Sequence, residues 1–309
     1  GEKAPYYNRI PIRNGKQARR RIPPAVHRMI QDQGMTALND FISAHEPLLR
    51  LGCFAGMLIA MAAAEALWPR RPDMGRAQRW PRNAALVVVD TLAVRAVAWA
   101  LPAFLPVAAA VLAADRGWGL FPFLGLDGWA AFGLALILFD LAIYGQHVAV
   151  HHIPVLWRLH RVHHSDMAID TTTGVRFHPL EILLSIVIKV ALVLALGAPA
   201  AAVVVFEVAL NATSLFNHAN LRLPLGVDAA LRRVLVTPDM HRVHHSVHRD
   251  ETDSNFGFNL SVWDRLFGTY RAQPRDGHDA MVIGVGDFRD PARLRLADLL
   301  VQPFRTPKA

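Results

Sequence analysis

The sequence predicts an all-α, integral-membrane protein: a bundle of about four to five membrane helices with a cytosolic, histidine-rich helical cap. The first observation is composition, because 53% of the 309 residues are hydrophobic and 19% are charged, whereas soluble domains carry about 25% charged residues. The second is a set of apolar stretches long enough to cross a bilayer. The third is that twelve of the fifteen histidines lie between His147 and His248, beside the ends of those stretches.

Charge and cysteine content exclude other classes of protein. The formal charge is +8, but the arginines gather beside the apolar stretches, which is typical of membrane flanks rather than of nucleic-acid binding. We therefore expect no nucleic-acid partner. The single cysteine, Cys53, excludes an internal disulfide and thiolate metal clusters. Any metal must then be bound by nitrogen and oxygen atoms.

The elements follow in order along the chain. Residues 1–46 are expected to be a basic N-terminal extension with a weak helix at about 25–42, and residues 47–309 the membrane domain. The apolar stretches of that domain are residues 47–68, 84–114, 129–150 and 179–216. Two prolines make the second a kinked span or a span followed by half a helix. Gly197-Ala198-Pro199 divides the fourth into two short halves, and both a full hairpin and a re-entrant one stay open.

Basic residues predict the orientation of the bundle. The loop at 69–83 holds five arginines and one aspartate, whereas the loop at 115–128 holds one arginine and two aspartates. Cytoplasmic loops are enriched in Lys and Arg, so we expect the first loop in the cytoplasm and the second outside. The membrane is expected to be a bacterial inner membrane. The histidine-rich segments then lie on the cytoplasmic side. The basic N-terminus conflicts with this orientation if residues 47–68 cross the membrane once.

Two charges inside the last apolar stretch are expected to meet. Lys189 lies nine residues before Ala198 and Glu207 nine residues after it, so a hairpin places both at one depth. Intramembrane charges are usually paired or functional. An ion pair is the preferred interpretation, and a functional role is the alternative.

Three histidine boxes carry the strongest signal in the sequence. His147 and His151 are four residues apart, and residues 160–164 and 241–245 both read His-Arg-Val-His-His. Positions i, i+3 and i+4 of a helix share a face about 5–6 Å apart, which lets two imidazoles reach one metal ion. Eight imidazoles exceed what one ion binds, so the boxes predict two ions.

The ligand type narrows the choice of metal. The zinc-protease motif His-Glu-x-x-His is absent, since Leu49 stands where the second histidine would follow His45-Glu46. No glutamate has a histidine three residues later, which excludes the Glu-x-x-His di-iron bundles. An all-imidazole, two-ion site at a membrane surface favours iron that activates oxygen. A zinc-dependent membrane hydrolase or a metal-binding protein is the alternative from another class.

Four more segments extend the pattern of the boxes. They are Leu156–Ser165, Phe177–Glu181, Glu251–Gly257 and Trp263–Tyr270. With the boxes they resemble the fatty acid hydroxylase/sterol desaturase superfamily over about residues 84–272, with a signature region at about 128–272. Members are integral-membrane, oxygen-dependent di-iron enzymes that act on lipids, among them sterol C4-methyl oxidases, fatty acid and sphingolipid hydroxylases, sterol desaturases and alkylglycerol monooxygenase. The resemblance implies the same fold and chemistry here.

The resemblance also implies the metal ligands. Eight come from the three boxes, and His218 is the ninth, because many relatives carry His-x-x-x-His between the second and third boxes and this chain keeps one of the two. His178 lies in a family-like segment, and the choice between ligand and supporting residue stays open. The implied set is His147, His151, His160, His163, His164, His178, His218, His241, His244 and His245.

Three other side chains are candidates for the catalytic site. Asp140 and Tyr144 share one helical stripe with His147 and His151. We expect Asp140 to orient Tyr144 or His147, with a simple interhelical hydrogen bond as the alternative. Asn255 ends an acidic segment that is expected to orient the third box.

These features together predict a membrane-bound di-iron monooxygenase. It would hydroxylate an unactivated C–H bond of a fatty acyl, sterol, sphingoid or ether lipid with O2 and external electrons; a lipid desaturase of the same superfamily is the alternative. Two Fe ions are the expected cofactor, with zinc able to replace them in purified protein. No G-x-G-x-x-G motif is present, so electrons are expected from a separate ferredoxin or cytochrome b5-type partner, or from a reduced pterin.

Overall fold

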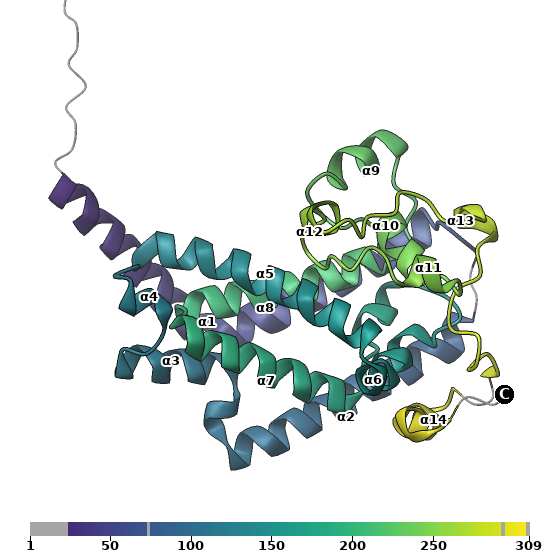
Figure 1. The fold of residues 1–309 in the computed structure, drawn as a ribbon, viewed down its shortest axis with the longest axis horizontal. Coiled ribbons are helices and arrows are strands. Elements are labelled where there is room, and N and C mark those ends of the chain that lie inside the picture. The colour runs from purple at the N-terminus through teal and green to yellow at the C-terminus, as the bar shows by residue number, and fades with distance from the viewer. Residues whose placement is uncertain (1–23, 73–74, 292–293, 307–309) are drawn as a thin grey trace, which may run out of the picture.

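The computed structural model describes residues 24–72, 75–291 and 294–306, with side chains from residue 34 onward. Within these ranges the chain is helical, and its only β-type pairings are three isolated bridges. Five helices are long and apolar enough to cross a membrane, and they form an elongated half that carries the histidine-rich half at one end (Figure 1). They are α1 (Pro24–Leu67), α2 (Arg76–Ala100), α5 (Gly128–His152), α7 (Pro179–Leu196) and α8 (Ala200–Asn217). The predicted all-α membrane bundle with a histidine-rich helical cap is confirmed.

The first helix is longer than the sequence predicts. α1 runs through Pro47 without a break and joins the predicted N-terminal helix to the first predicted span. Proline in a helix interior removes a backbone hydrogen bond, but Ile42, one turn earlier, packs against Ala201 and Val204 of α8 and holds the first half of α1 in line. The predicted domain boundary falls inside this helix, and the division of the chain at residue 46 stays a prediction.

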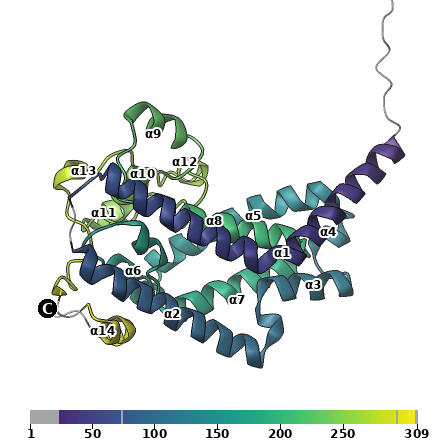
Figure 2. The same ribbon diagram turned by 180° about the vertical axis from the view of Figure 1, so that it is seen from behind.

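Prolines divide the second apolar stretch into a span and half a helix, one of the two predicted alternatives. α2 ends at Ala100, and Pro102 and Pro106 each occupy the first turn of the next short helix, where a missing N–H is tolerated. These helices are η1 (Pro102–Phe104), α3 (Pro106–Arg116) and α4 (Leu120–Phe123). α3 packs against α7 and α8 at the end of the bundle away from the cap (Figures 1 and 2).

α7 and α8 form the predicted hairpin. Each has 18 residues, or about 27 Å of helix. Gly197 ends α7 with φ of 66°, a left-handed conformation that glycine adopts without steric cost. Small and aromatic side chains then pack the hairpin against α5, where the rings of Phe139 and Phe206 lie 5.3 Å apart. The hairpin runs beside α5 and α1 along the bundle (Figures 1 and 2).

The expected ion pair inside the hairpin is present and has a third member. Lys189 Nζ lies 2.6 Å from one Glu207 oxygen, and an Arg50 nitrogen lies 2.7 Å from the other. Arg50 also contacts Glu46 at 2.8 Å. We call Arg50, Lys189 and Glu207 the charged triad; α1 supplies the cation that the hairpin sequence alone did not reveal.

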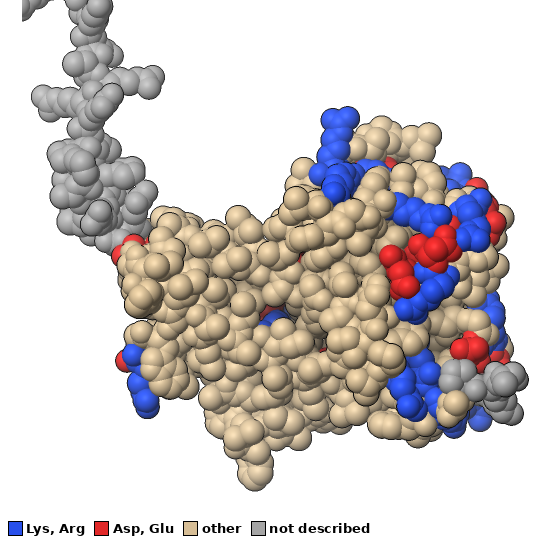
Figure 3. Space-filling model, viewed as in Figure 1, with Lys and Arg blue, Asp and Glu red and all other residues tan. Residues whose placement is uncertain are grey.

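The surface of the bundle is suited to lipid rather than to water. Large apolar side chains such as Leu48, Ile59 and Trp99 are 69%, 69% and 88% exposed, far more than soluble proteins leave uncovered. Figure 3 shows this half without charge over most of its face, whereas Lys, Arg, Asp and Glu gather on the cap. The five apolar helices therefore make this a membrane protein.

The cap is built from short helices and loops that follow the long helices. They are α6 (Pro154–His164), η2 (Thr171–Val175), α9 (Leu225–Leu231), α10 (Pro238–His244), α11 (Arg249–Thr252), α12 (Val262–Leu266), α13 (Gly277–Ala280), α14 (Leu296–Val301) and η4 (Gln302–Phe304). α5 and α8 both end in the cap (Figure 1). Their last residues bring His147, His151 and His218 to the boxes that α6 and α10 carry.

Candidate metal centre

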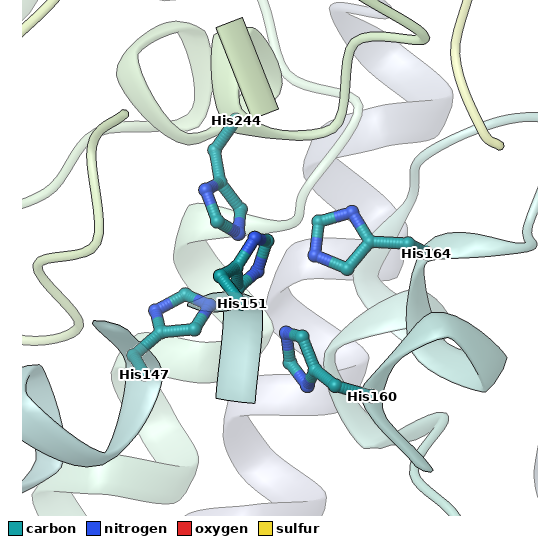
Figure 4. A group of neighbouring side chains, drawn as sticks. All are labelled: His147, His151, His160, His164 and His244. Atoms are coloured by element: carbon teal, nitrogen blue, oxygen red, sulfur yellow. The ribbon is translucent and has the colours of Figure 1, made fainter. Parts of the chain in front are cut away.

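Nine buried histidines meet in two groups where the membrane helices enter the cap. The five-histidine group is His147, His151, His160, His164 and His244. The four-histidine group is His163, His218, His241 and His245. Within each group one ring nitrogen from every member lies within 4.8 Å of those of the others. Figure 4 shows the rings of the five-histidine group pointing into one common space from α5, α6 and α10.

Helical periodicity explains how the boxes divide between the two groups. Successive residues turn by about 100° on an α-helix, so positions i and i+4 are about 40° apart, whereas i+3 and i+4 are about 100° apart. His160 and His164 accordingly share the five-histidine group, and His163 turns to the other. In the third box His241 and His245 stay together and His244 turns away. Each of these two boxes therefore contributes to both groups.

Backbone carbonyls fix the tautomer of several rings. Nδ1 of His147 donates to the Phe256 carbonyl at 2.8 Å, and Nδ1 of His244 donates to the Ser254 carbonyl at 2.7 Å. Nδ1 of His218 donates to the Ser214 carbonyl at 2.8 Å. A carbonyl oxygen only accepts, so Nδ1 carries the proton and Nε2 is left with a lone pair. That lone pair is the one that faces into the group.

Carboxylates hold two more rings of the five-histidine group. Nδ1 of His160 lies 2.6 Å from Glu181, which begins α7, and Nδ1 of His151 lies 3.4 Å from Asp253. Histidines that bind metals usually donate their other N–H to such a group, which orients the ring and raises its basicity. The arrangement is therefore that of a ligand shell with its supporting partners in place.

The nitrogens that face inward fit a bound cation. In the five-histidine group all five Nε2 atoms are buried without a hydrogen-bond partner. In the four-histidine group Nε2 of His218 lies 3.1 Å from that of His163 and 3.0 Å from that of His241. Nδ1 of His218 and of His163 each lie against a backbone carbonyl, so the Nε2 lone pairs of these two rings face and repel each other, whereas two ligands about 2.1 Å from one ion and at right angles are about 3.0 Å apart. The donor set thus fits one divalent cation in each group.

Burial keeps the cap histidines neutral. It lowers the pKa of His218 and of His244 to about 3, against 6.5 for a free imidazole. It also lowers the pKa of His163, His164 and His245, and neighbouring histidines lower it further. A metal ligand must be unprotonated. The centre is therefore ready for a cation at neutral pH without losing protons.

Buried arginines and residues near the C-terminus hold α6, and neither was expected from the sequence. Arg176 is 1% exposed and donates to the Val162 carbonyl and to Asn83 of α2. Arg161 donates to the Gln302 and Arg305 carbonyls near the C-terminus. The Arg161 bonds span more than a hundred residues, so no local pattern could have predicted them.

His178 does not reach either group of histidines. It caps α7, where its Nδ1 accepts from the Leu180 N–H at 3.2 Å and its Nε2 contacts the Leu300 carbonyl at 3.1 Å. With both ring nitrogens in use, it has none left for a metal. The sequence left open whether His178 is a metal ligand or a supporting residue. In the structure it is not a ligand, and it anchors the start of α7 to α14.

The three other candidates hold the loops that follow the third box. Asp140 accepts from the indole N–H of Trp263 at 2.8 Å and from the Leu260 N–H at 3.2 Å. These two bonds match the alternative of a simple interhelical hydrogen bond. They correct the expectation that Asp140 orients Tyr144 or His147. Tyr144 instead bonds Thr269 at 3.0 Å.

Asn255 links α10, which carries the third box, to the chain at Arg271. It adopts φ of 52° and donates to the Met240 and Arg271 carbonyls, while its oxygen accepts from the Arg271 N–H. Asparagine tolerates this left-handed conformation better than most residues. Because Met240 lies beside His241 in α10, these bonds join the third box to the loop at Arg271.

A cavity of about 620 Å³ lies in the helical bundle, and part of its wall contacts the histidines of the metal centre. Near the histidines its wall includes Phe177, Ser214 and Glu181. Phe177 stacks on His163 with ring centroids 4.5 Å apart, and Glu181 holds His160. The volume is typical of small-molecule sites. Figure 3 shows charged side chains inside a hollow on the uncharged face of the bundle.

Comparisons with known proteins agree on a family for this region. The model of the family described as fatty acid hydroxylase matches residues 132–269. The ornithine lipid hydroxylase OlsE of Rhizobium tropici is 32% identical over 142 residues, 46% of this chain and 42% of that protein. Human alkylglycerol monooxygenase is 32% identical over 137 residues, 43% of this chain and 29% of that protein.

Cholesterol 25-hydroxylase of the rat is 28% identical over 145 residues, 46% of this chain and 47% of that protein. The chain thus matches less than half the length of each of these relatives. No solved structure matches the chain significantly. Residues 132–269, which carry both histidine groups, are therefore similar to the fatty acid hydroxylase family and to these lipid hydroxylases and monooxygenases.

Proposed function

We propose that this protein is a membrane-bound monooxygenase that hydroxylates a C–H bond of a lipid, with one iron ion in each histidine group. The observation that carries the proposal is the pair of buried, all-imidazole groups at the inner end of a cavity within a membrane bundle. The relatives support it, since those named above are hydroxylases or monooxygenases of lipids. The ligands proposed are the nine histidines of the two groups.

The proposed reaction converts R–H, O2, two electrons and two protons into R–OH and H2O. Iron, when bound, supplies the redox chemistry that activates O2 for insertion into the C–H bond. The chain supplies the rest. The nine Nε2 or Nδ1 atoms bind the ions, and the carbonyls and carboxylates behind them keep each ring in its orientation.

The cavity positions the lipid and excludes water. Its wall joins the bundle to the metal centre at Phe177, Phe258 and Ser214, so a lipid entering from the bilayer brings a chain segment to the histidines. Burial of all nine imidazoles limits access by solvent, which would quench an activated centre. We infer that the reacting carbon lies beside Phe177, where the cavity is nearest to His163.

The charge distribution supports a cytoplasmic cap in a bacterial inner membrane. Arginines of the 69–83 loop, such as Arg71 and Arg76, lie at the cap end, and the opposite end carries Arg116. Positive charge concentrates on the cytoplasmic side. We propose that electrons arrive there from a separate ferredoxin or cytochrome b5-type protein; dependence on an added pterin instead would show the alternative donor.

The decisive experiment measures metal, oxygen and product together. Purified protein should contain about two irons per chain, consume O2 only with reductant and lipid, and add one oxygen atom from ¹⁸O2 to the lipid. His163→Ala should lose about half of the iron, because it removes a ligand of the four-histidine group. His178→Ala, a histidine outside both groups, is the control and should keep both ions.

The other outcomes are equally clear. A lipid that loses two hydrogens and gains no oxygen would identify a desaturase. Zinc alone, with no reductant-dependent oxygen uptake in any lipid extract, would refute the monooxygenase and favour a hydrolase.

A further inference from the structure

One stretch of the bundle cavity is lined by oxygen atoms that lack partners. Asp90 of α2 is 9% exposed, and its Oδ1 is buried without a hydrogen bond. Gln146 of α5 and Glu181 of α7 line the same cavity, and Gln146 Oε1 and Glu181 Oε2 are also buried and unpartnered. The three residues come from three different membrane helices. Their free atoms are all hydrogen-bond acceptors.

The three acceptors line one cavity, and two of them adjoin the metal centre. The other oxygen of Glu181 holds His160 at 2.6 Å, and Gln146 directly precedes His147 in α5. A group bound by these acceptors therefore lies in the cavity whose wall reaches His160 through Glu181 and His163 through Phe177.

An unpaired carboxylate inside a membrane bundle is costly. Among the described residues, no hydrogen bond or ion pair joins Asp90 to a cation, and Arg95, which also lines the cavity, lies five residues further along α2. The charged triad shows the opposite case in the same wall, because both oxygens of Glu207 are taken by Arg50 and Lys189. Asp90 lacks the cationic partners that Glu207 has in the charged triad.

We propose that the cavity selects lipids whose polar end donates hydrogen bonds, a hydroxyl or a primary ammonium group, and that Asp90 with Gln146 accepts them. This inference rests on the proposed function, since it names the substrate class of the same cavity. A lipid whose polar end only accepts hydrogen bonds would leave Asp90 unpaired and would bind poorly. The specificity residues are thus Asp90 and Gln146, distinct from the metal ligands.

Matched lipid pairs test this without any variant. Phosphatidylethanolamine and phosphatidylcholine with the same acyl chains differ only in N-methylation, which removes every N–H donor. A long-chain monoalkylglycerol and its dimethyl ether differ in the same way for hydroxyls. With full-length, metal-loaded protein in detergent micelles, the donor member of at least one pair should bind about tenfold tighter or better, as expected for a hydrogen bond to a charged group.

Variants then identify the acceptor and the donor. Asp90→Asn keeps the size and a carbonyl acceptor but removes the charge, so it should abolish a preference for ammonium and largely keep one for hydroxyl. Asp90→Leu should abolish both preferences. Thr91→Val is the matched control in the same wall, because the Thr91 hydroxyl already bonds the Val87 carbonyl at 2.7 Å; it should leave the affinities unchanged.

Each outcome decides the proposal. Equal affinity within both pairs, tighter binding of the methylated members, or preferences that survive in Asp90→Leu would overturn it. Failure of the proposed function gives a different result: donor-selective binding would persist while no lipid gains oxygen. Hydroxylation without donor selectivity would leave the enzyme assignment standing and refute the inference.

Discussion

The charged triad gives the sharpest test of how the bundle is held together. Glu207 is 8% exposed and is shared by two cations, Lys189 at 2.6 Å and Arg50 at 2.7 Å. Glu207→Ala leaves Lys189 without a partner, whereas Arg50 keeps Glu46 at 2.8 Å. Removing one partner of a buried pair costs about 3–5 kcal/mol, because the remaining charge is uncompensated. We expect a loss of that size for Glu207→Ala.

The other members of the cycle follow from the same contacts. In Lys189→Ala, Glu207 still has Arg50, so the expected loss is about 1.5–3 kcal/mol, the value of a hydrogen bond to a charged group. In the double variant no unpaired charge remains, and Arg50 and Glu46 still meet. The double variant should therefore be more stable than Glu207→Ala. It should not be more stable than Lys189→Ala, which is the result expected if Lys189 and Glu207 formed a pair without Arg50.

Thermal unfolding of the four proteins in one detergent, at one scan rate, measures this cycle. A kcal/mol corresponds to roughly 2–4 °C for chains of 150–250 residues, so Glu207→Ala should melt about 10 °C below the wild type. Val203→Ala, a substitution of a nearby apolar residue of α8, is a control for loss of packing alone. If the losses of the two single variants simply add in the double variant, the triad does not stabilise the bundle by this mechanism.

Two further predictions concern the metal centre. Glu181→Gln removes the carboxylate behind His160 but keeps its size, and should weaken metal binding about 10–100-fold in a chelator competition; unchanged affinity would show that the 2.6 Å contact has no role in binding. The stability of the metal-free protein should depend on pH through the two cap histidines whose pKa burial lowers to about 3. Because the unfolded imidazoles bind protons below about pH 6.5, this contribution is complete above that pH and is lost as pH falls toward 3, by about 1.4 kcal/mol per unit for each histidine. A melting temperature that is flat or rises from pH 6.5 to 4.5 would refute this.

Much of the fold could be predicted because membrane helices are locally determined. A bilayer requires a continuous apolar stretch with its backbone hydrogen bonds satisfied internally, so length, prolines and the break at Gly197 predict the spans and the hairpin. The start of the first span was predicted at Pro47, but α1 continues through this proline. The continuation depends on packing against α8, which no local pattern encodes.

Much of the candidate site could also be predicted, because spacing on a helix determines which imidazoles share a face. The same spacing could also have predicted how the second and third boxes divide. Positions i+3 and i+4 are about 100° apart on a helix, so their histidines face different groups. His178 and Asp140 were harder, because their partners at Leu300 and Trp263 lie more than a hundred residues away.

The sequence by itself determined that the protein has apolar spans, histidine boxes that can share faces of helices and a single cysteine that excludes thiolate clusters. Local rules suffice for these, since each depends on residue type and helical period. Only the tertiary structure decided how five and four histidines group, that Arg50 completes the charged triad, and that Asp90, Gln146 and Glu181 line one cavity with unpartnered oxygens. These depend on which helices pack together, and packing joins residues that are distant in the chain.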